Sequence, residues 1–126
     1  MLVDDDSITN FLNELLIKEM DISEELIITP DGQKALDLLY NRCVLKGECP
    51  DLILLDVNMP VINGFEFLKR YNEMVFENKQ SIVIVMLSTS LNPRDKEKAE
   101  ALNVNDYLNK PLSKDRINEL LDKYFD

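Results

Sequence analysis

The sequence predicts an α/β fold in which a five-stranded parallel sheet is covered by helices on both faces. Short apolar runs alternate with amphipathic stretches along the 126 residues. The runs at 52–55 and 82–87 are apolar without a break, as expected for strands that are buried on both faces. Such strands, alternating with helices, are typical of a parallel sheet between two helical layers.

The first strand and the first helix lie close to the start of the sequence. Only three apolar residues precede Asp4, whereas strands average about five or six residues, so this strand is either trimmed or short. The first helix is indicated by apolar residues in the i, i+3, i+4, i+7, i+8 pattern of one helical face. These residues are Ile8, Phe11, Leu12, Leu15 and Leu16.

Further strands and helix starts follow in order. Strands are expected at 26–28, 52–55, 82–87 and 104–108. Capping residues then mark where the other helices begin. The expected starts are Asp31-Gly32, Asn63 with Glu66 three residues later, Asn92-Pro93 and Ser113. The last helix carries apolar residues from Ile117 to Phe125.

Composition limits the classes of function. The chain has 24 acidic and 14 basic residues, a net charge of −10, which disfavours direct binding to nucleic acid. No apolar run reaches the roughly 20 residues that a membrane span needs, and no secretory signal is evident, so the cytoplasm is the expected location. The absence of histidine excludes Ser-His-Asp and Cys-His catalysis and the usual zinc sites. Cys43 and Cys49 are expected to be reduced thiols.

Polar residues follow four of the five expected strands. They are Asp4-Asp5-Asp6, Asp56, Ser88-Thr89-Ser90 and Lys110. Because the functional crevice of an open parallel sheet lies beyond the carboxyl ends of its strands, these groups are expected to converge. Adjacent carboxylates repel one another unless protons or a cation intervene, and Mg²⁺ is the cation that such oxygen ligands favour. A carboxylate nucleophile, a metal, a lysine and a hydroxyl together favour phosphoryl transfer.

Four motifs carry a resemblance to a known family. Residues 2–6 (Leu-Val-Asp-Asp-Asp), 54–60 (Leu-Leu-Asp-Val-Asn-Met-Pro), 87–88 (Leu-Ser) and 107–111 (Tyr-Leu-Asn-Lys-Pro) resemble the receiver domains of two-component response regulators, of the chemotaxis-regulator type. The likeness covers the whole chain and implies one receiver domain over residues 1–126. It also implies the doubly wound, flavodoxin-like (βα)5 fold with strand order 2-1-3-4-5.

The resemblance implies a role for each motif. Asp56 would accept a phosphoryl group from phosphohistidine on a sensor histidine kinase or histidine phosphotransfer protein. Asp5 would be the principal ligand of Mg²⁺, with Asp4 alongside it, directly or through water, and with Asp56 and the backbone carbonyl of Asn58 completing the protein ligands. No enzymatic activity beyond self-phosphorylation and self-dephosphorylation is expected.

The remaining residues would carry the signal. Lys110 would hold the Asp56 carboxylate and then a phosphoryl oxygen, and its bond to Pro111 is often cis in this family. Ser88 would bind the phosphoryl group, with Thr89 as the alternative, and Tyr107 would move inward with it. The change would reach the surface of the fourth helix, fifth strand and fifth helix, where a downstream protein or a phosphorylation-dependent dimer partner would bind.

Other functions remain open on the residues. A non-phosphorylated interaction module of the same fold is the main alternative, because the sequence does not identify a kinase. A haloacid-dehalogenase-like phosphatase normally has a second aspartate two residues after the first, where this chain has Asn58, and an amide cannot act as a general acid or base. A flavodoxin-like electron carrier needs a phosphate-binding loop, whereas Asp4-Asp5-Asp6 would repel a phosphate.

Overall fold

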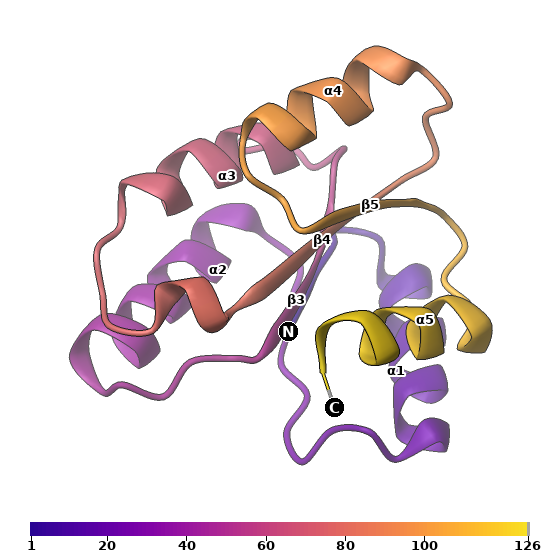
Figure 1. The fold of residues 1–126 in the computed structure, drawn as a ribbon, viewed down its shortest axis with the longest axis horizontal. Coiled ribbons are helices and arrows are strands. Elements are labelled where there is room, and N and C mark those ends of the chain that lie inside the picture. Colours follow the sequence, from indigo (N-terminus) through magenta and orange to yellow (C-terminus); the bar gives the residue numbers. More distant parts are fainter. Residues whose placement is uncertain (126) are drawn as a thin grey trace.

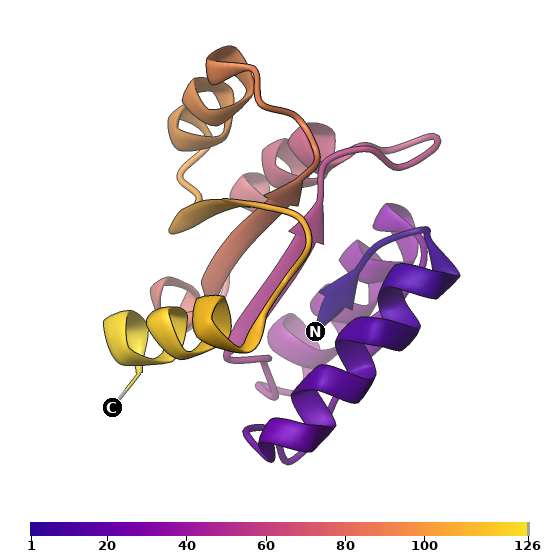
Figure 2. The ribbon, with the colours of Figure 1, turned by 90° about the vertical axis from the view of Figure 1, so that its right-hand side faces the viewer.

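The computed structural model describes residues 1–125 as five strands and five α-helices in alternation (Figures 1 and 2). The strands are β1 (Leu2–Val3), β2 (Ile28–Thr29), β3 (Leu52–Asp56), β4 (Val83–Ser88) and β5 (Asp106–Asn109). The helices are α1 (Ser7–Met20), α2 (Gly32–Leu39), α3 (Gly64–Glu73), α4 (Pro93–Ala101) and α5 (Lys114–Tyr124). A π-helical segment, η1 (Tyr40–Leu45), continues α2, and a 3-10 turn, η2 (Lys79–Ser81), precedes β4.

All neighbouring strands are parallel, and their order is β2-β1-β3-β4-β5. This confirms the expected fold class and strand order. The expected boundaries were less accurate, since β2 and β5 each begin two residues later than predicted. The segment before β5 is instead used as a turn, in which the Asn105 side chain accepts a hydrogen bond from the Ile84 N–H at 2.8 Å.

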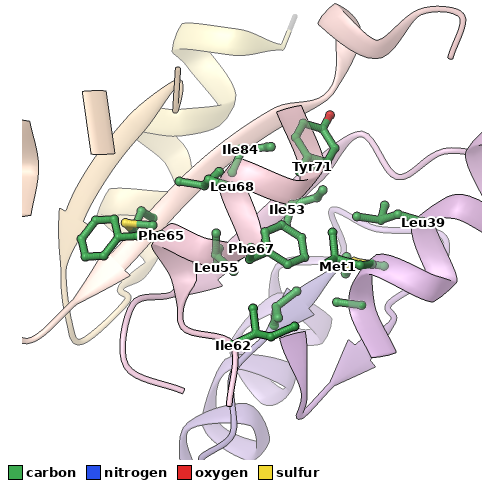
Figure 3. Packing of buried hydrophobic residues seen from close by; sticks show 14 of the residues in the cluster. Met1, Leu39, Ile53, Leu55, Ile62, Phe65, Phe67, Leu68, Tyr71 and Ile84 are labelled. Atoms are coloured by element: carbon green, nitrogen blue, oxygen red, sulfur yellow. The ribbon is translucent and has the colours of Figure 1, made fainter. Parts of the chain in front are cut away.

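The sheet separates two apolar cores. Helices α2, α3 and α4 cover one face, and α1 and α5 cover the other (Figures 1 and 2). On the first face, Phe67 and Leu68 of α3 are fully buried against Ile53, Leu55 and Ile84 of the sheet (Figure 3). Burying these side chains on both faces explains why β3 and β4 are continuously apolar.

The predicted capping residues occupy the helix starts. The side chains of Asp31, Asn63, Asn92 and Ser113 each accept a hydrogen bond from a backbone N–H in the first turn of the following helix. Asn63 accepts from the Glu66 N–H at 2.9 Å, as the sequence pattern indicates. Capping satisfies N–H groups that have no partner inside the helix.

Most of the apolar stripe of α1 faces away from the sheet, and only Leu16 of its five residues packs partly against the core. Ile8, Phe11, Leu12 and Leu15 are exposed by 51–69%, whereas the buried positions of the helix are Asn10, Asn13 and Ile17. Periodicity therefore predicted the helix correctly but does not identify its buried face.

The two cysteines differ from expectation. Cys43, at the wide turn of η1, and Cys49, in the loop before β3, form a disulfide, and their Cα atoms are 4.8 Å apart. The expectation of two reduced thiols is corrected, because η1 and the turn after it bring together residues that are six positions apart.

Candidate functional site

The carboxyl ends of four strands place the polar residues at one edge of the sheet. Asp4 directly follows β1, Asp56 and Ser88 are the last residues of β3 and β4, and Lys110 directly follows β5. Asp56 pairs with Leu87 in the ladder, so Ser88 lies one residue further along the neighbouring strand. The predicted convergence of these residues is therefore present in the structure.

A lysine joins two buried carboxylates at the centre of the site. The Lys110 Nζ lies 2.7 Å from Asp4 Oδ2 and 3.0 Å from Asp56 Oδ1. Asp4 and Asp56 expose only 4% and 6% of their surface. The peptide bond between Lys110 and Pro111 is cis, as the family resemblance implies.

Burial and charge change the acidity of this pair. Burial raises the pKa of the Asp56 carboxyl above its usual range, the Lys110 hydrogen bond opposes that rise, and the neighbouring Asp4 charge adds to it. Burial alone would lower the pKa of Lys110, but its hydrogen bonds to Asp4 and Asp56 outweigh that effect and raise it. Lys110 therefore remains a cation against the carboxylates.

Three carboxylates are close enough to share a metal ion. Oxygen atoms of Asp4, Asp5 and Asp56 lie within 4.8 Å of one another. The two Asp4 oxygens already accept hydrogen bonds, Oδ1 from the Asp6 N–H at 2.9 Å and Oδ2 from Lys110. Asp5 is exposed, so its carboxylate is the most accessible of the three. Hard divalent cations prefer such oxygen ligands.

Asp6 and Asn58 lie at the margin of the cluster. The Asp6 carboxylate caps α1, since it accepts hydrogen bonds from the Ile8 N–H at 3.0 Å and from the Thr9 hydroxyl at 2.9 Å. Asn58 is exposed in the loop after β3, two residues beyond Asp56. Asp6 is therefore a helix cap, while Asn58 remains a candidate ligand.

The two candidate switch hydroxyls differ in burial. Ser88 is fully buried, and its Oγ accepts a hydrogen bond from the Ser90 N–H at 2.9 Å. Thr89 is exposed. Tyr107, which pairs with Met86 in β4, packs against the α2–α3–α4 core. Its hydroxyl is buried and has no hydrogen-bond partner among residues 1–125.

Two contacts at the site were missed by sequence reasoning. A Cβ atom on Gly64, the first residue of α3, would lie 2.5 Å from the Asp56 carbonyl oxygen and 3.0 Å from the Val57 Cα. The Asn10 side chain donates a hydrogen bond of 2.8 Å to the Asp4 carbonyl. Both contacts join elements that are separate in sequence. The only sequence signal for either one is the glycine at the start of α3, which could have suggested the close approach of Gly64 to Asp56.

Comparisons with known proteins agree with this geometry. The family model of the response regulator receiver domain matches residues 1–122. A two-component response regulator from Cytophaga hutchinsonii is 37% identical, with a TM-score of 0.87, and the match covers 98% of this chain and 92% of that one.

Two cyanobacterial proteins are also similar. Response regulator Rcp1 of Synechocystis sp. is 34% identical over 87% of this chain and 74% of its own length. The structure of Mn²⁺-bound Rcp1 has a TM-score of 0.69 at 29% identity, covering 97% of this chain and 87% of that one. The phosphorylated phytochrome response regulator RcpA has a TM-score of 0.70 at 30% identity, covering 97% and 86%.

Proposed function

Because the chain belongs to the response regulator receiver domain family of two-component signalling, we propose that Asp56 is its phosphoacceptor and that residues 1–126 form one receiver domain. The observation that carries the assignment is the position of the Asp56 carboxylate. It is buried at the end of β3, 3.0 Å from the Lys110 Nζ, in one cluster with Asp4 and Asp5. Phosphorylation of the similar protein RcpA supports the same chemistry here.

The proposed reaction is transfer from phosphohistidine. An Asp56 carboxylate oxygen attacks the phosphorus atom, and the P–N bond to the donor imidazole breaks. The electron pair of that bond returns to the imidazole nitrogen, so the products are an aspartyl phosphate and a free histidine. Lys110 holds the carboxylate in place beforehand and offers its charge to a phosphoryl oxygen afterwards. The donor is a sensor histidine kinase or a histidine phosphotransfer protein.

Mg²⁺ is the proposed cofactor. Three carboxylates face one lysine charge in this cluster, so a divalent cation would offset their repulsion. Asp5, Asp56 and the Asn58 carbonyl would be direct ligands, and Asp4 would bind directly or through water. When bound, Mg²⁺ supplies positive charge that stabilises the phosphoryl oxygens during transfer. The Mn²⁺-bound form of the similar protein Rcp1 supports the binding of a divalent cation by this chain.

The signal would leave the site through β4 and β5. We infer that Ser88, rather than the exposed Thr89, binds the phosphoryl group, because Ser88 ends the strand that pairs with β3. Tyr107 would respond when Ser88 binds the phosphoryl group. It lies on β5 and pairs with Met86, which is in β4 together with Ser88. The α4-β5-α5 surface would then bind a downstream protein or a second phosphorylated copy.

Location and turnover complete the proposal. Among residues 1–125 there is no helix of the length and apolar character that a bilayer requires, and the family acts as a signalling phosphoacceptor. We infer a cytoplasmic protein whose only catalysis is its own phosphorylation and dephosphorylation.

The test uses acetyl phosphate as the donor. The purified chain is incubated with acetyl phosphate, with and without Mg²⁺, and its intact mass is measured; one added phosphoryl group is expected only with Mg²⁺. Asp56→Asn should abolish the gain. Asp51→Asn, which changes an exposed aspartate next to the opposite end of β3, should not. No gain, with no beryllofluoride binding in excess Mg²⁺, would favour the non-phosphorylated interaction module instead.

A further inference from the structure

Asn10 occupies a place that an apolar residue would ordinarily fill. It lies on the buried face of α1, with only 6% of its surface exposed. Its Nδ2 donates a hydrogen bond of 2.8 Å to the Asp4 backbone carbonyl. The partner is a carbonyl, so the amide nitrogen must be the atom that faces it. Asn10 therefore joins α1 to the turn that carries Asp4 and Asp5.

This turn has little other support from the sheet. Strand β1 contains two residues, and each pairs once with β2 and once with β3. The Asp4 N–H adds one hydrogen bond to the Thr29 carbonyl, at 3.2 Å. A longer first strand would hold the Asp4 backbone by more ladder hydrogen bonds. Because β1 is short, the position of Asp4 depends more strongly on the Asn10 amide.

The oxygen atom of the Asn10 side-chain amide indicates that stability alone does not favour asparagine at this position. Its Oδ1 is buried and has no hydrogen-bond partner among the described residues. Burial of an unpaired polar atom is unfavourable. Leucine is similar in size and would avoid it, so the hydrogen bond to Asp4 is the property that distinguishes asparagine here.

We propose that Asn10 is a positioning residue for the metal site, which holds the Asp4 carbonyl and so sets the Asp4 and Asp5 carboxylates for Mg²⁺. The inference rests on the proposed function and names a residue that supports the same site. Groups that orient metal ligands without touching the ion commonly change affinity by 10- to 100-fold when they are removed.

The test compares Asn10→Leu with Asn13→Leu. Asn13 is also a buried asparagine and lies one turn further along the same face of α1. Its replacement therefore controls for the loss of a buried amide that does not bind the Asp4 carbonyl. Melting temperature is measured against Mg²⁺ concentration in the unphosphorylated chain, and the dissociation constant follows from the shift. Asn10→Leu should weaken Mg²⁺ binding about tenfold or more, whereas Asn13→Leu should stay within about twofold of the parent chain.

The outcomes separate this inference from the proposed function. An unchanged Mg²⁺ affinity in folded Asn10→Leu, or an equal loss in both variants, would overturn the positioning role. So would a parent chain that does not bind Mg²⁺. A parent chain that binds Mg²⁺ with the expected Asn10 dependence but accepts no phosphoryl group would refute the proposed function and leave the positioning role intact. At saturating Mg²⁺, Asn10→Leu should recover phosphorylation by acetyl phosphate.

Discussion

Asp56 lies in a charge environment that does not favour folding. Its carboxylate and that of Asp4 are both buried, and a single lysine contacts them. Desolvation of such groups can exceed the attraction between them. The raised pKa of Asp56 has this origin, because burial and the Asp4 charge disfavour its ionised form. The arrangement is instead suited to receiving positive charge and a phosphoryl group.

Replacing Asp56 should therefore stabilise the protein in the absence of metal. A carboxyl whose pKa is raised in the folded state adds stability only while it is protonated, and that contribution is lost as the pH rises through the folded pKa. Above the folded pKa of Asp56, Asp56→Asn removes an ionised buried group without changing its shape. We expect the melting temperature to rise by about 3 °C or more, as measured by circular dichroism in metal-free buffer. Asp51→Asn should give no rise, and a lower melting temperature for Asp56→Asn would contradict the argument.

Gly64 should be essential to the placement of Asp56. An added Cβ would meet the Asp56 carbonyl oxygen at 2.5 Å, so Gly64→Ala must displace the start of α3 or the end of β3. We expect a loss of roughly 1–3 kcal/mol in unfolding free energy and phosphorylation by acetyl phosphate at least about tenfold slower. Gly47→Ala is the control, since a Cβ there meets no atom within 4 Å and only its positive φ opposes the change. Equal phosphorylation rates in the two variants would show that the close approach is unimportant.

The limits of sequence reasoning at this scale follow from what a motif contains. Asp4, Asp56 and Lys110 follow strands, and the geometry of a parallel sheet predicts that such residues meet. Gly64 and Asn10 act through contacts with the backbone of another element, and no local pattern records those contacts. The roles of Ser88 and Tyr107 stay predictions, since they concern a movement that one conformation does not contain.

Helix α1 shows where element-scale patterns are ambiguous. Its apolar residues recur at helical spacing, and amphipathic periodicity usually marks the face toward the core. In this helix four of the five spaced apolar residues are exposed, Leu16 is partly buried, and Asn10, Asn13 and Ile17 are buried. Periodicity therefore predicts the type of element but not which face is turned inward.

Substitutions on the two faces of α1 should show which face packs against the core, the one indicated by apolar periodicity or the one that is buried in the structure. Leu12 is 58% exposed and Ile17 is 7% exposed. Leu12→Gln should change the unfolding free energy by less than about 0.5 kcal/mol, while Ile17→Ala should lower it by roughly 2–5 kcal/mol. Urea unfolding monitored by circular dichroism measures both. If Leu12→Gln were the more destabilising change, the inward face of α1 would have to be reassigned.

At the scale of the whole molecule, the two ends of the sheet bury different ionisable groups. The carboxyl ends of the strands carry the acidic cluster, while the opposite end contains the amino group of Met1, which donates a hydrogen bond of 2.8 Å to the Leu52 carbonyl. A cavity of about 770 Å³ lies beside Met1, lined by apolar side chains such as Ile17 and Leu121 and by charged ones that include Arg42 and Asp51. The net charge of −10 makes stability sensitive to salt as well as to pH.

The buried Met1 amino group should dominate the dependence of stability on pH near neutrality. Burial lowers its pKa from 8.0 to about 6, with the Asp51 charge opposing the shift. Because the folded state favours the neutral amine, protonation costs stability, so the unfolding free energy should rise between pH 6 and pH 8. The expected rise is about 2 kcal/mol. The chain has no histidine, the side chain whose ordinary pKa would otherwise overlap this range.

Acetylation of the amino group provides the decisive comparison. It removes the titration, and the cavity beside Met1 has room for an acetyl group. Urea unfolding at pH 6, 7 and 8 should show the rise in the chain with a free amine and a much smaller one in the acetylated chain. Carrying out both series in Asp56→Asn removes the carboxyl whose raised pKa acts in the opposite direction. Equal slopes in the two chains would mean that the Met1 amine is solvated, and that the interior of the sheet at this end admits water.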